Sequence, residues 1–499
     1  MINSRIDCSS IEMIKKTFSS DVGSLPNNPA IEADLQYFIK KLQSADISSL
    51  VIATFSEFYR QFRSGKQGLV PESAITPLHP QELRSLNNLS VYSKHGEEAL
   101  PHTVVIKLNG GLGTTMGCNG PKSLIEVKNG LHFLDITARQ LDSFSRKTGT
   151  TPPLILMNSY NTDKESLEAL QTYSDLPDSL PRSFLQNRFP RIDAETMLPV
   201  TWPDAPRNEW NPPGHGDIYT ALTDSGLLKL LLEHKFRYAF ISNSDNLGAT
   251  LDTALLGYLS EESPGFLMEV TARTPMDRKG GHIARFKGGN LILRESIQCP
   301  ENDQRYFQDI YRHRFFNTNN IWIDLAALDN LIASSEGTFR LPLLCNKKFI
   351  DATAPHSPLV YQLESAMGSA LSVFPAAAAV SVPRSRFLPV KTCEELLLLR
   401  SDFYSVTDDF RIVPFSGSPE KTPEITLDSR YFGTVDQIDR RFGKGIPSLT
   451  HCGKFTVEGD VYFGSGCSIT GAVTIVNRTD APYTIPDDTA LSEDLQIGN

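Results

Sequence analysis

The sequence has few of the features that assign a protein to a membrane or to nucleic acid. Its longest apolar run, Phe374 to Val382, is far shorter than the ~20 residues of a membrane-spanning helix. The stretch from Met1 to Ser10 has no apolar core of a secretory signal. Basic residues form no long run, and 58 acidic residues outnumber 48 basic ones, for a net charge of −10. We therefore expect no membrane partner and no nucleic-acid partner.

Cysteines are few and scattered. The chain has seven of them, an odd number, and no two form a CxxC pair. This pattern argues against a disulfide framework and against a zinc site, because both need paired or closely spaced thiols. Reduced thiols are typical of a reducing compartment, so we expect the protein in the cytoplasm.

Length and composition indicate a globular chain of more than one domain, with 499 residues, 40% hydrophobic and 21% charged. Apolar residues recur at three- and four-residue spacing between Ala30 and Arg63, which predicts helices that pack on the main domain. The expected parts are a helical region, a central α/β domain, a connecting segment and a C-terminal β-region, at residues 1–100, 101–395, 396–450 and 451–499.

From Pro101 onward, short apolar runs alternate with helical patterns. Strands are expected in HTVVIKL, PLILMN, YAFISNSD and GFLMEVT, and helices in LDITARQLDSFSRKTG and DSGLLKLLLEHKF. This alternation predicts an α/β fold with a mixed, mostly parallel central sheet. Ligands bind such sheets beyond the carboxyl ends of the strands, so functional residues should follow the strands.

The C-terminal region has a six-residue period. Phe455, Val461, Cys467 and Val473 share one register, and glycines fall in the expected turns. Such a period predicts coils of a parallel β-helix. A few coils alone would be marginally stable, so this region should pack on another part of the chain. The open edge of a β-helix could also stack on a second copy, which makes self-association possible.

A glycine-rich loop follows one expected strand. The stretch VVIKLNGGLGTTMGCNGPKSL contains five glycines before Lys122, and glycines let backbone N–H groups approach a phosphate. The spacing from Gly111 to Gly117 is one residue too long for the GxGxxG of a Rossmann loop. A Walker A loop is also excluded, because Pro121 separates Gly120 from Lys122. A purely structural glycine loop is the alternative.

This loop resembles the signature loop of the UTP–glucose-1-phosphate uridylyltransferase family, also called UDP-glucose pyrophosphorylases. Other segments match the same family in order, namely LILMNSYNTD, FLQNRFPRI, NPPGHGDIY, ISNSDNLGAT, MEVTART, FNTNNIW, QLESAMG and VPRSRFLPVKT. The match runs from about residue 100 to 395 and continues into the C-terminal repeats. A single glycine loop is weak evidence, whereas many segments in the same order are specific.

The resemblance implies a fold and a reaction. The fold would be a Rossmann-like, GT-A-like nucleotidyltransferase domain with a C-terminal left-handed parallel β-helix. The reaction would convert UTP and glucose 1-phosphate to UDP-glucose and pyrophosphate, reversibly and with Mg²⁺. Its nucleophile is already a phosphate dianion, so the protein would mainly align two polyanions and neutralise their charge.

The resemblance also implies catalytic residues, namely Lys122, Lys391 and Asp245. The two lysines would neutralise the phosphates, and Asp245 would hold Mg²⁺. Asp245 could instead cap the next helix. Nucleotide contacts are implied for Leu108, Asn109, Gly110, Gly111, Lys122, Gln186, Gly214, Asn243, Ser244 and Lys391.

Sugar-phosphate contacts are implied for Gly110, Gly111, His215, Asn243, Ser244, Asp245, Glu269 and Asn319. The amide of Gln186 both donates and accepts hydrogen bonds, which suits a pyrimidine edge, although Gln186 could be an ordinary loop residue. His215 would donate to the sugar phosphate, and a structural histidine is the alternative. Asn319, and less strongly Glu269, would hydrogen-bond the glucose hydroxyls.

Two other functions remain open at this stage. A related UDP-sugar or UDP-N-acetylhexosamine pyrophosphorylase would share the glycine loop and differ in the sugar pocket. A protein that binds nucleotide sugars without turnover would lack Lys122, Asp245 or Lys391, and all three are present.

Overall fold

The computed structural model describes residues 28–498 except for 66–67, 174–179, 336–337, 352–353, 355 and 418–420. The chain divides into two compact units. Unit 1 comprises Met1–Ile106, Phe184–Ile241 and Asp252–Arg384, and unit 2 comprises Lys107–Ser183, Ser242–Leu251 and Ser385–Asn499. The chain passes from one unit to the other within strands β3 (Thr103–Asn109), β7 (Ser183–Leu185) and β11 (Tyr238–Asn243). The domain boundaries expected at residues 100, 395 and 450 stay predictions.

Unit 1 contains a mixed sheet with the strand order β2-β18-β12-β15-β11. The strands β2, β18 and β12 are parallel, and β15 is antiparallel to both β12 and β11. Every residue of β15 except Asn319 is buried, as expected for a strand covered on both faces. Apart from β3, β7 and β11, the strands of unit 1 are β1 (Ile75–Pro77), β2 (Arg84–Ser85), β8 (Phe189–Pro190), β9 (Ile192–Asp193), β10 (Trp210–Asn211), β12 (Phe266–Ala272), β13 (His282–Phe286), β14 (Leu291–Arg294), β15 (Phe315–Asp324), β16 (Leu344–Phe349), β17 (Leu359–Glu364) and β18 (Ala377–Ser381).

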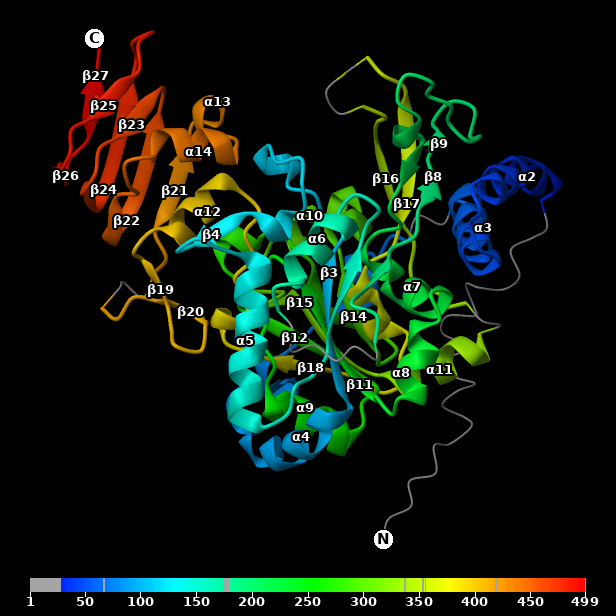
Figure 1. The fold of residues 1–499 in the computed structure, drawn as a ribbon. Helices are drawn as coiled ribbons and strands as arrows, with labels where there is room; N and C mark the ends of the chain where they lie inside the picture. The colour runs from blue at the N-terminus through cyan, green and yellow to red at the C-terminus, as the bar shows by residue number, and fades with distance from the viewer. Residues whose placement is uncertain are drawn as a thin grey trace. The chain divides into compact units, whose positions relative to one another are not determined.

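The helices of unit 1 are α2 (Pro29–Ser44), α3 (Ser49–Arg63), α4 (Ser93–Ala99), α7 (Ile218–Asp224), α8 (Leu227–Glu233), α9 (Thr253–Glu262), α10 (Gln304–Phe307) and α11 (Leu325–Ser334). The helices expected between Ala30 and Arg63 are confirmed as the pair α2 and α3, drawn in blue in Figure 1. Their N-termini are capped by the side chains of Asn28 and Ser48. They share an apolar cluster in which Phe38 and Phe55 are fully buried.

Helix α4 lies outside the stretch in which the apolar spacing predicts helices. It packs on α9 at very short range through two glycines. A Cβ added at Gly96 would lie 1.8 Å from the carbonyl oxygen of Thr253, and one at Gly257 would lie 1.9 Å from that of Tyr92. This contact depends on the absence of side chains and leaves no apolar period in the sequence, which explains why the pattern does not predict α4.

Unit 2 carries the helices α5 (Phe133–Thr148), α6 (Asp163–Leu170), α12 (Cys393–Arg400), α13 (Ser429–Phe432) and α14 (Val435–Arg441). Its strands are β4 (Glu126–Lys128), β5 (Leu131–His132), β6 (Leu154–Asn158), β19 (Tyr404–Val406), β20 (Ile412–Pro414), β21 (Glu424–Leu427), β22 (Ser448–Glu458), β23 (Val461–Phe463), β24 (Ser468–Asn477), β25 (Tyr483–Ile485), β26 (Ala490–Leu491) and β27 (Leu495–Ile497). The predicted α/β fold class is thereby confirmed.

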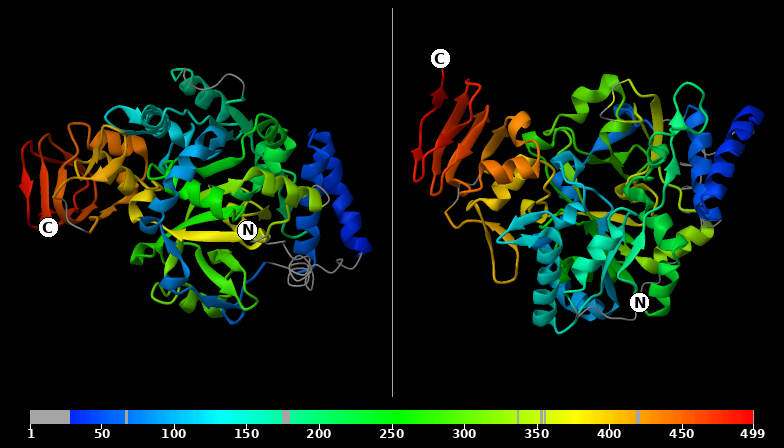
Figure 2. Two further views of the ribbon diagram at one scale, coloured as in Figure 1. Left: turned by 90° about the horizontal axis from the view of Figure 1, so that it is seen from below. Right: turned by 45° about the horizontal axis from the view of Figure 1, so that its top comes forward.

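The C-terminal strands of unit 2 stack in parallel, as the six-residue period predicts. Phe455 pairs with Val473 and Val457 with Ile475 between β22 and β24, and Ile475 pairs in turn with Leu495 of β27. A second layer is formed by β23 and β25, which are also parallel. Figure 2 shows these strands as stacked arrows coloured orange and red. Successive coils thus place equivalent apolar residues above one another.

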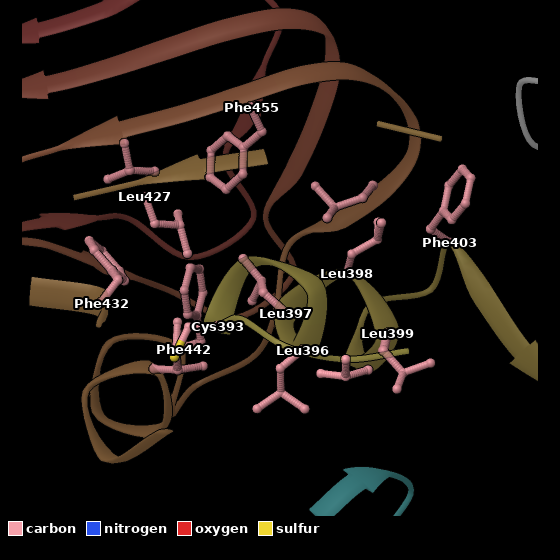
Figure 3. Close-up of a cluster of buried hydrophobic side chains, with 14 of the residues drawn as sticks. Cys393, Leu396, Leu397, Leu398, Leu399, Phe403, Leu427, Phe432, Phe442 and Phe455 are labelled. Carbon is pink, nitrogen blue, oxygen red and sulfur yellow. The ribbon is translucent and has the colours of Figure 1, made fainter. Parts of the chain in front are cut away.

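Helix α12 packs against the end of this parallel stack that begins with β21. Leu396, Leu397 and Leu399 are at most 1% exposed and join one apolar cluster with Phe455 of β22 (Figure 3). Each buried leucine contributes roughly 1.5–3 kcal/mol of transfer free energy. The expectation that the C-terminal coils pack on another part of the chain is therefore confirmed within unit 2. No helix in the described part of the chain is long and apolar enough to cross a membrane.

Candidate functional site

The residues predicted to bind substrate lie in two groups, one in each unit. The group of unit 2 contains Leu108, Asn109, Gly110, Gly111, Lys122, Asn243, Ser244, Asp245 and Lys391. The group of unit 1 contains Gln186, Gly214, His215, Glu269 and Asn319. Each group is assembled from segments that are far apart in the sequence.

In unit 2, the glycine loop begins where β3 ends and folds back on itself. The N–H of Lys122 donates to the carbonyl of Gly111 at 3.1 Å, and the N–H of Gly113 donates to that of Gly120 at 3.3 Å. At its tip, the fully buried Met116 is part of the apolar cluster of unit 2. This fold brings Lys122 back to the carboxyl end of β3, where ligands bind α/β sheets.

The backbone around Gly111 is open. A Cβ added there would meet no atom within 4 Å, and Gly111 is not among the glycines with positive φ. Within the described residues, the N–H groups of Gly110 and Gly111 have no acceptor. Neither packing nor backbone strain therefore explains a glycine at position 111, whereas the close approach of a phosphate would.

Lys122 and Asp245 form an ion pair. The Lys122 Nζ lies 2.5 Å from Asp245 Oδ2, and the two side chains are only 16% and 13% exposed. Asp245 sits in the turn after β11, and the N–H of Ser244 donates to the carbonyl of Leu108 at 3.1 Å. The ends of β3 and β11 are thus adjacent, and the structure brings together two predicted catalytic residues that are 123 positions apart.

The alternative role of Asp245 as a helix cap does not hold. The next helix, α9, is capped by the side chain of Asp252, which accepts from the N–H groups of Ala254 and Leu255. Asp245 makes its contact with Lys122 instead.

Asn109 faces the interior of unit 2. It is 1% exposed, and its Nδ2 donates to Asn158 Oδ1 and to Ser166 Oγ, both at 2.8 Å. These bonds tie the end of β3 to the end of β6 and to α6. The predicted nucleotide contact of Asn109 therefore falls to its backbone.

Lys391 is exposed and directly precedes Thr392, the N-cap of α12. The segment leading to it is held by Asn246, which is 2% exposed. Asn246 Oδ1 accepts from the N–H of Leu388 at 2.8 Å, and its Nδ2 donates to the carbonyl of Arg386 at 3.2 Å. Sequence reasoning did not single out Asn246, although it directly follows Asp245.

In unit 1, the loop of Gly214 and His215 packs on the segment after β17. Gly214 has φ of +79°, and a Cβ there would lie 2.4 Å from the carbonyl oxygen of Ser365. Glycine is thus required at position 214 by the fold itself. His215 Nδ1 accepts from the N–H of Met367 at 2.9 Å. A neutral imidazole that accepts at Nδ1 carries its proton on Nε2, so His215 presents Nε2 as a donor.

Gln186 follows β7 and is half-buried. Its neighbour Asn187 is bound to the carboxylate of Asp217, which follows His215 in the PPGHGD segment. Asn187 N donates to Asp217 Oδ2 at 2.6 Å, and Asn187 Nδ2 donates to Asp217 Oδ1 at 2.9 Å. The residues predicted to contact the base and the sugar phosphate are thereby linked. Sequence reasoning quoted Asp217 within its segment but gave it no role.

Glu269 and Asn319 meet at an irregularity of the unit 1 sheet. Met268 pairs with Ile321 and Val270 with Asn317, so three residues of β15 lie opposite Glu269 alone. Such bulges redirect side chains.

Within this bulge, Asn319 has φ of +57°, and its Oδ1 accepts from Asn317 Nδ2 at 2.8 Å. Glu269 is fully buried. Its carboxylate accepts from Trp322 Nε1 at 2.9 Å and from Asn320 Nδ2 at 3.1 Å. Glu269 therefore braces the bulge that presents Asn319, and its predicted sugar contact remains a prediction.

No group of three or more His, Cys, Asp or Glu residues within the described ranges could hold a metal ion. A single carboxylate still suits Mg²⁺, which is commonly held by one or two carboxylates, water and substrate phosphates. The ammonium of Lys122 on Asp245 shows that this carboxylate accepts a cation at short range. The residues present thus fit a magnesium ion.

A pocket of about 590 Å³ in unit 2 is lined in part by Gly120, Pro121 and Arg400. Its lining includes none of the residues predicted to bind substrate. It therefore lies beside the glycine loop and does not mark the predicted phosphate site.

Comparison with known proteins gives one consistent family. The family model described as UTP–glucose-1-phosphate uridylyltransferase matches residues 52–470. The curated protein of that name from Encephalitozoon cuniculi is 38% identical over 447 residues, covering 89% of this chain and 87% of the relative. The one from Saccharomyces cerevisiae is 37% identical over 497 residues, covering 97% of each chain.

Solved structures are similar over nearly the whole chain as well. Open and closed structures of UDP-glucose pyrophosphorylase from Leishmania major match with a TM-score of 0.86 at 42% identity, covering 93% of this chain and 99% of that one. A mutant of the same enzyme in complex with UDP-glucose matches with a TM-score of 0.85 at 42% identity and the same coverage.

Proposed function

This chain belongs to the UTP–glucose-1-phosphate uridylyltransferase family, and on that premise we propose that it converts UTP and glucose 1-phosphate to UDP-glucose and pyrophosphate, reversibly. The observation that carries the proposal is the Lys122–Asp245 ion pair beside the open amides of the glycine loop. A cation, a metal-binding carboxylate and free N–H donors at the carboxyl ends of two strands are what two reacting phosphates need.

The chemistry is a displacement at phosphorus. A non-bridging oxygen of glucose 1-phosphate forms a bond to the α-phosphorus of UTP, and the bond from that phosphorus to the bridging oxygen of the β-phosphate breaks. The electron pair of the broken bond leaves with pyrophosphate. No general base is required, because the nucleophile is already an anion. The protein contributes alignment and charge neutralisation.

Unit 2 supplies the groups for the phosphates. The N–H groups of Gly110 and Gly111 donate to phosphate oxygens, and Lys122 leaves Asp245 to pair with the triphosphate. Asp245 would then hold Mg²⁺, which would supply further charge neutralisation. Asn243 and Ser244 contact the ribose and the sugar. Lys391 adds a second cation.

Unit 1 supplies the groups that recognise the base and the sugar. Gln186 hydrogen-bonds the uracil edge, and Gly214 lets the backbone approach the base. The Nε2–H of His215 donates to the sugar phosphate. Asn319 hydrogen-bonds the glucose hydroxyls from its bulge. Glu269 is the second candidate for hydrogen bonds to these hydroxyls.

The test is a substrate panel. Pyrophosphate release is measured for four nucleoside triphosphates crossed with the 1-phosphates of glucose, galactose and N-acetylglucosamine, with Mg²⁺ present. We expect release chiefly with UTP and glucose 1-phosphate. Preference for another sugar phosphate would instead support a related UDP-sugar or UDP-N-acetylhexosamine pyrophosphorylase. Binding of UDP-glucose without release would refute the enzymatic proposal.

We also propose self-association through the C-terminal stack. Its last strand, β27, carries Leu495 and Ile497, which are only partly buried, at the end of a series of parallel pairings. Sedimentation of the full chain at increasing concentration tests this, and a constant monomer mass would contradict it.

The six described cysteines are unpaired, which supports a reducing compartment, the cytoplasm.

A further inference from the structure

Asp217 is a buried carboxylate whose contacts do not serve its own helix. It stands at the N-cap position of α7, where an aspartate ordinarily accepts from the first N–H groups of the helix. Its side chain makes no such capping bond. Both oxygens instead accept from Asn187, 30 positions earlier in the chain, at 2.6 Å and 2.9 Å.

The bonds to Asn187 act on Gln186. Within the described part of the chain, the Gln186 amide has no hydrogen-bond partner, so no hydrogen bond of its own fixes its position. The position of its backbone is fixed one residue later, where Asn187 N donates to Asp217. The position of the backbone from which the Gln186 side chain extends therefore depends on Asp217.

Asp217 itself belongs to a loop that is hydrogen-bonded to another segment. The loop pairs with the segment after β17, where the N–H of Gly216 donates to Ser365 at 2.9 Å and the N–H of Ser365 donates to Pro213 at 2.8 Å. His215, two positions before Asp217, accepts from Met367. Asp217 thus connects the segment of Gln186 to the loop of Gly214 and His215, both of which belong to unit 1.

We propose that Asp217 is a positioning residue for nucleotide selection, which holds Asn187 and thereby the adjoining backbone that brings the Gln186 amide to the base. This inference rests on the proposed function, in which Gln186 reads the uracil edge. The unfavourable burial of the Asp217 carboxylate, which the bonds from Asn187 offset, supports the proposal. Burial raises the pKa of Asp217 to about 6, against the lowering effect of the two bonds from Asn187. An ionised carboxylate in this position therefore depends on both bonds.

The first variant is Asp217→Asn, which keeps the shape of the side chain. The new amide can still accept from Asn187 N, but its own NH₂ group then faces the NH₂ group of Asn187. We expect the ratio of kcat/KM for UTP to that for CTP to fall by about tenfold or more, because a small misplacement of a recognising group is costly. Asn187→Ala, which removes only the side-chain bond, should lower the same ratio less.

The decisive variant is the exchange Asp217→Asn with Asn187→Asp. It reverses the polarity of the side-chain bond and leaves an acceptor for the N–H of residue 187. We expect it to restore the UTP-to-CTP ratio to within a few-fold of the wild type, which a purely structural role would not predict. The matched control is Asp324→Asn, a buried aspartate of the same unit that caps α11. It should lower the melting temperature without changing base selectivity.

Selectivity is measured in parallel as the binding ratio, which is the dissociation constant for CTP divided by that for UTP. If the wild type binds UTP selectively without turnover, the proposed reaction fails, and a lower binding ratio in Asp217→Asn still supports this inference. Stable Asp217→Asn protein with wild-type selectivity in both assays would overturn it. Loss of selectivity in Asp217→Asn but not in Gln186→Ala would also overturn it, because the effect would not pass through Gln186.

Discussion

At the residue scale, the main finding is that two residues assigned to substrate are bound to each other. Lys122 and Asp245 are mostly buried and form an ion pair at 2.5 Å. Each charge compensates the other, so neither stays buried without a partner. In the proposed reaction, Lys122 would pair with the triphosphate and Asp245 would hold Mg²⁺, so both charges would stay compensated when substrate binds.

Asp245→Asn tests this exchange. We expect the Mg²⁺ concentration for half-maximal rate to rise by tenfold or more, because loss of a ligating carboxylate weakens the metal site at least as much as loss of its supporting bonds does. Calorimetric titration of Mg²⁺ into the chain with bound UTP gives a second readout. Asp252→Asn serves as the control, because it makes the same chemical change at the N-cap of α9, where asparagine can still accept from the helix N–H groups. An unchanged Mg²⁺ titration would rule out Asp245 as a ligand.

Lys391→Ala tests the second cation. Lys391 is exposed, and exposed lysines add little to stability, so the melting temperature should stay near that of the wild type. The value of kcat should fall by roughly 10²- to 10³-fold if Lys391 neutralises charge in the transition state. Lys444→Ala, at a lysine side chain of unit 2 that is 65% exposed, is the control and should leave kcat unchanged. A parallel loss of stability and activity in Lys391→Ala would contradict the assignment.

At the element scale, local irregularities present the candidate residues. The bulge of β15 opposite Glu269 turns Asn319 out of an otherwise buried strand. The positive φ of Asn319 is one that asparagine tolerates better than most residues and glycine tolerates best. Backbone conformation and side-chain chemistry can therefore be separated at this position.

Asn319→Gly keeps the bulge and removes the amide. We expect a free energy of unfolding close to that of the wild type and a higher KM for glucose 1-phosphate, with KM for UTP little changed. Asn319→Ala should lose the amide and also about 1 kcal/mol of stability, because alanine disfavours positive φ. Chemical denaturation and initial rates measure both effects. An unchanged KM for the sugar phosphate in the glycine variant would remove Asn319 from the sugar site.

At the scale of the whole molecule, the net charge has the same sign as the expected substrates. The chain carries a net charge of −10, yet the proposed reaction joins two polyanions. The proposed attraction is local: Lys122 and the open amides stand at the carboxyl ends of β3 and β11, and Lys391 belongs to the same unit. In this proposal, donors at the strand ends decide phosphate binding more than the net charge does.

Acid sensitivity is a second property at this scale. His282 and His313 of unit 1 stack with ring centroids 3.8 Å apart and are both fully buried. Burial, and then the charges of His313, Arg273 and Arg294, lower the pKa of His282 well below its usual value. In the unfolded chain, the imidazole of His282 becomes protonated as the pH falls below about 6.5, whereas in the folded chain it stays neutral at that pH. The stability contributed by a neutral His282 is therefore present at neutral pH and is lost as the pH falls.

His282→Phe should reduce this loss. Phenylalanine keeps a flat ring beside Phe307 and does not titrate. We expect the melting temperature of the variant to fall less than that of the wild type between about pH 7 and pH 5. His451→Gln, at an exposed histidine of unit 2, is the control and should keep the wild-type slope. Parallel slopes for wild type and His282→Phe would show that this histidine does not contribute to acid sensitivity.

The sequence by itself determined the fold class, the family, the paired helices after Pro29 and the parallel C-terminal stack. Each of these leaves a periodic or contiguous pattern, and periodicity reflects which face of an element is buried. Only the tertiary structure decided that Lys122 pairs with Asp245, that Asn246 holds the segment before Lys391, and that Asp217 bonds to Asn187 rather than to its own helix. These contacts join residues far apart in the chain, so their partners are chosen by the packing of whole elements and leave no local pattern.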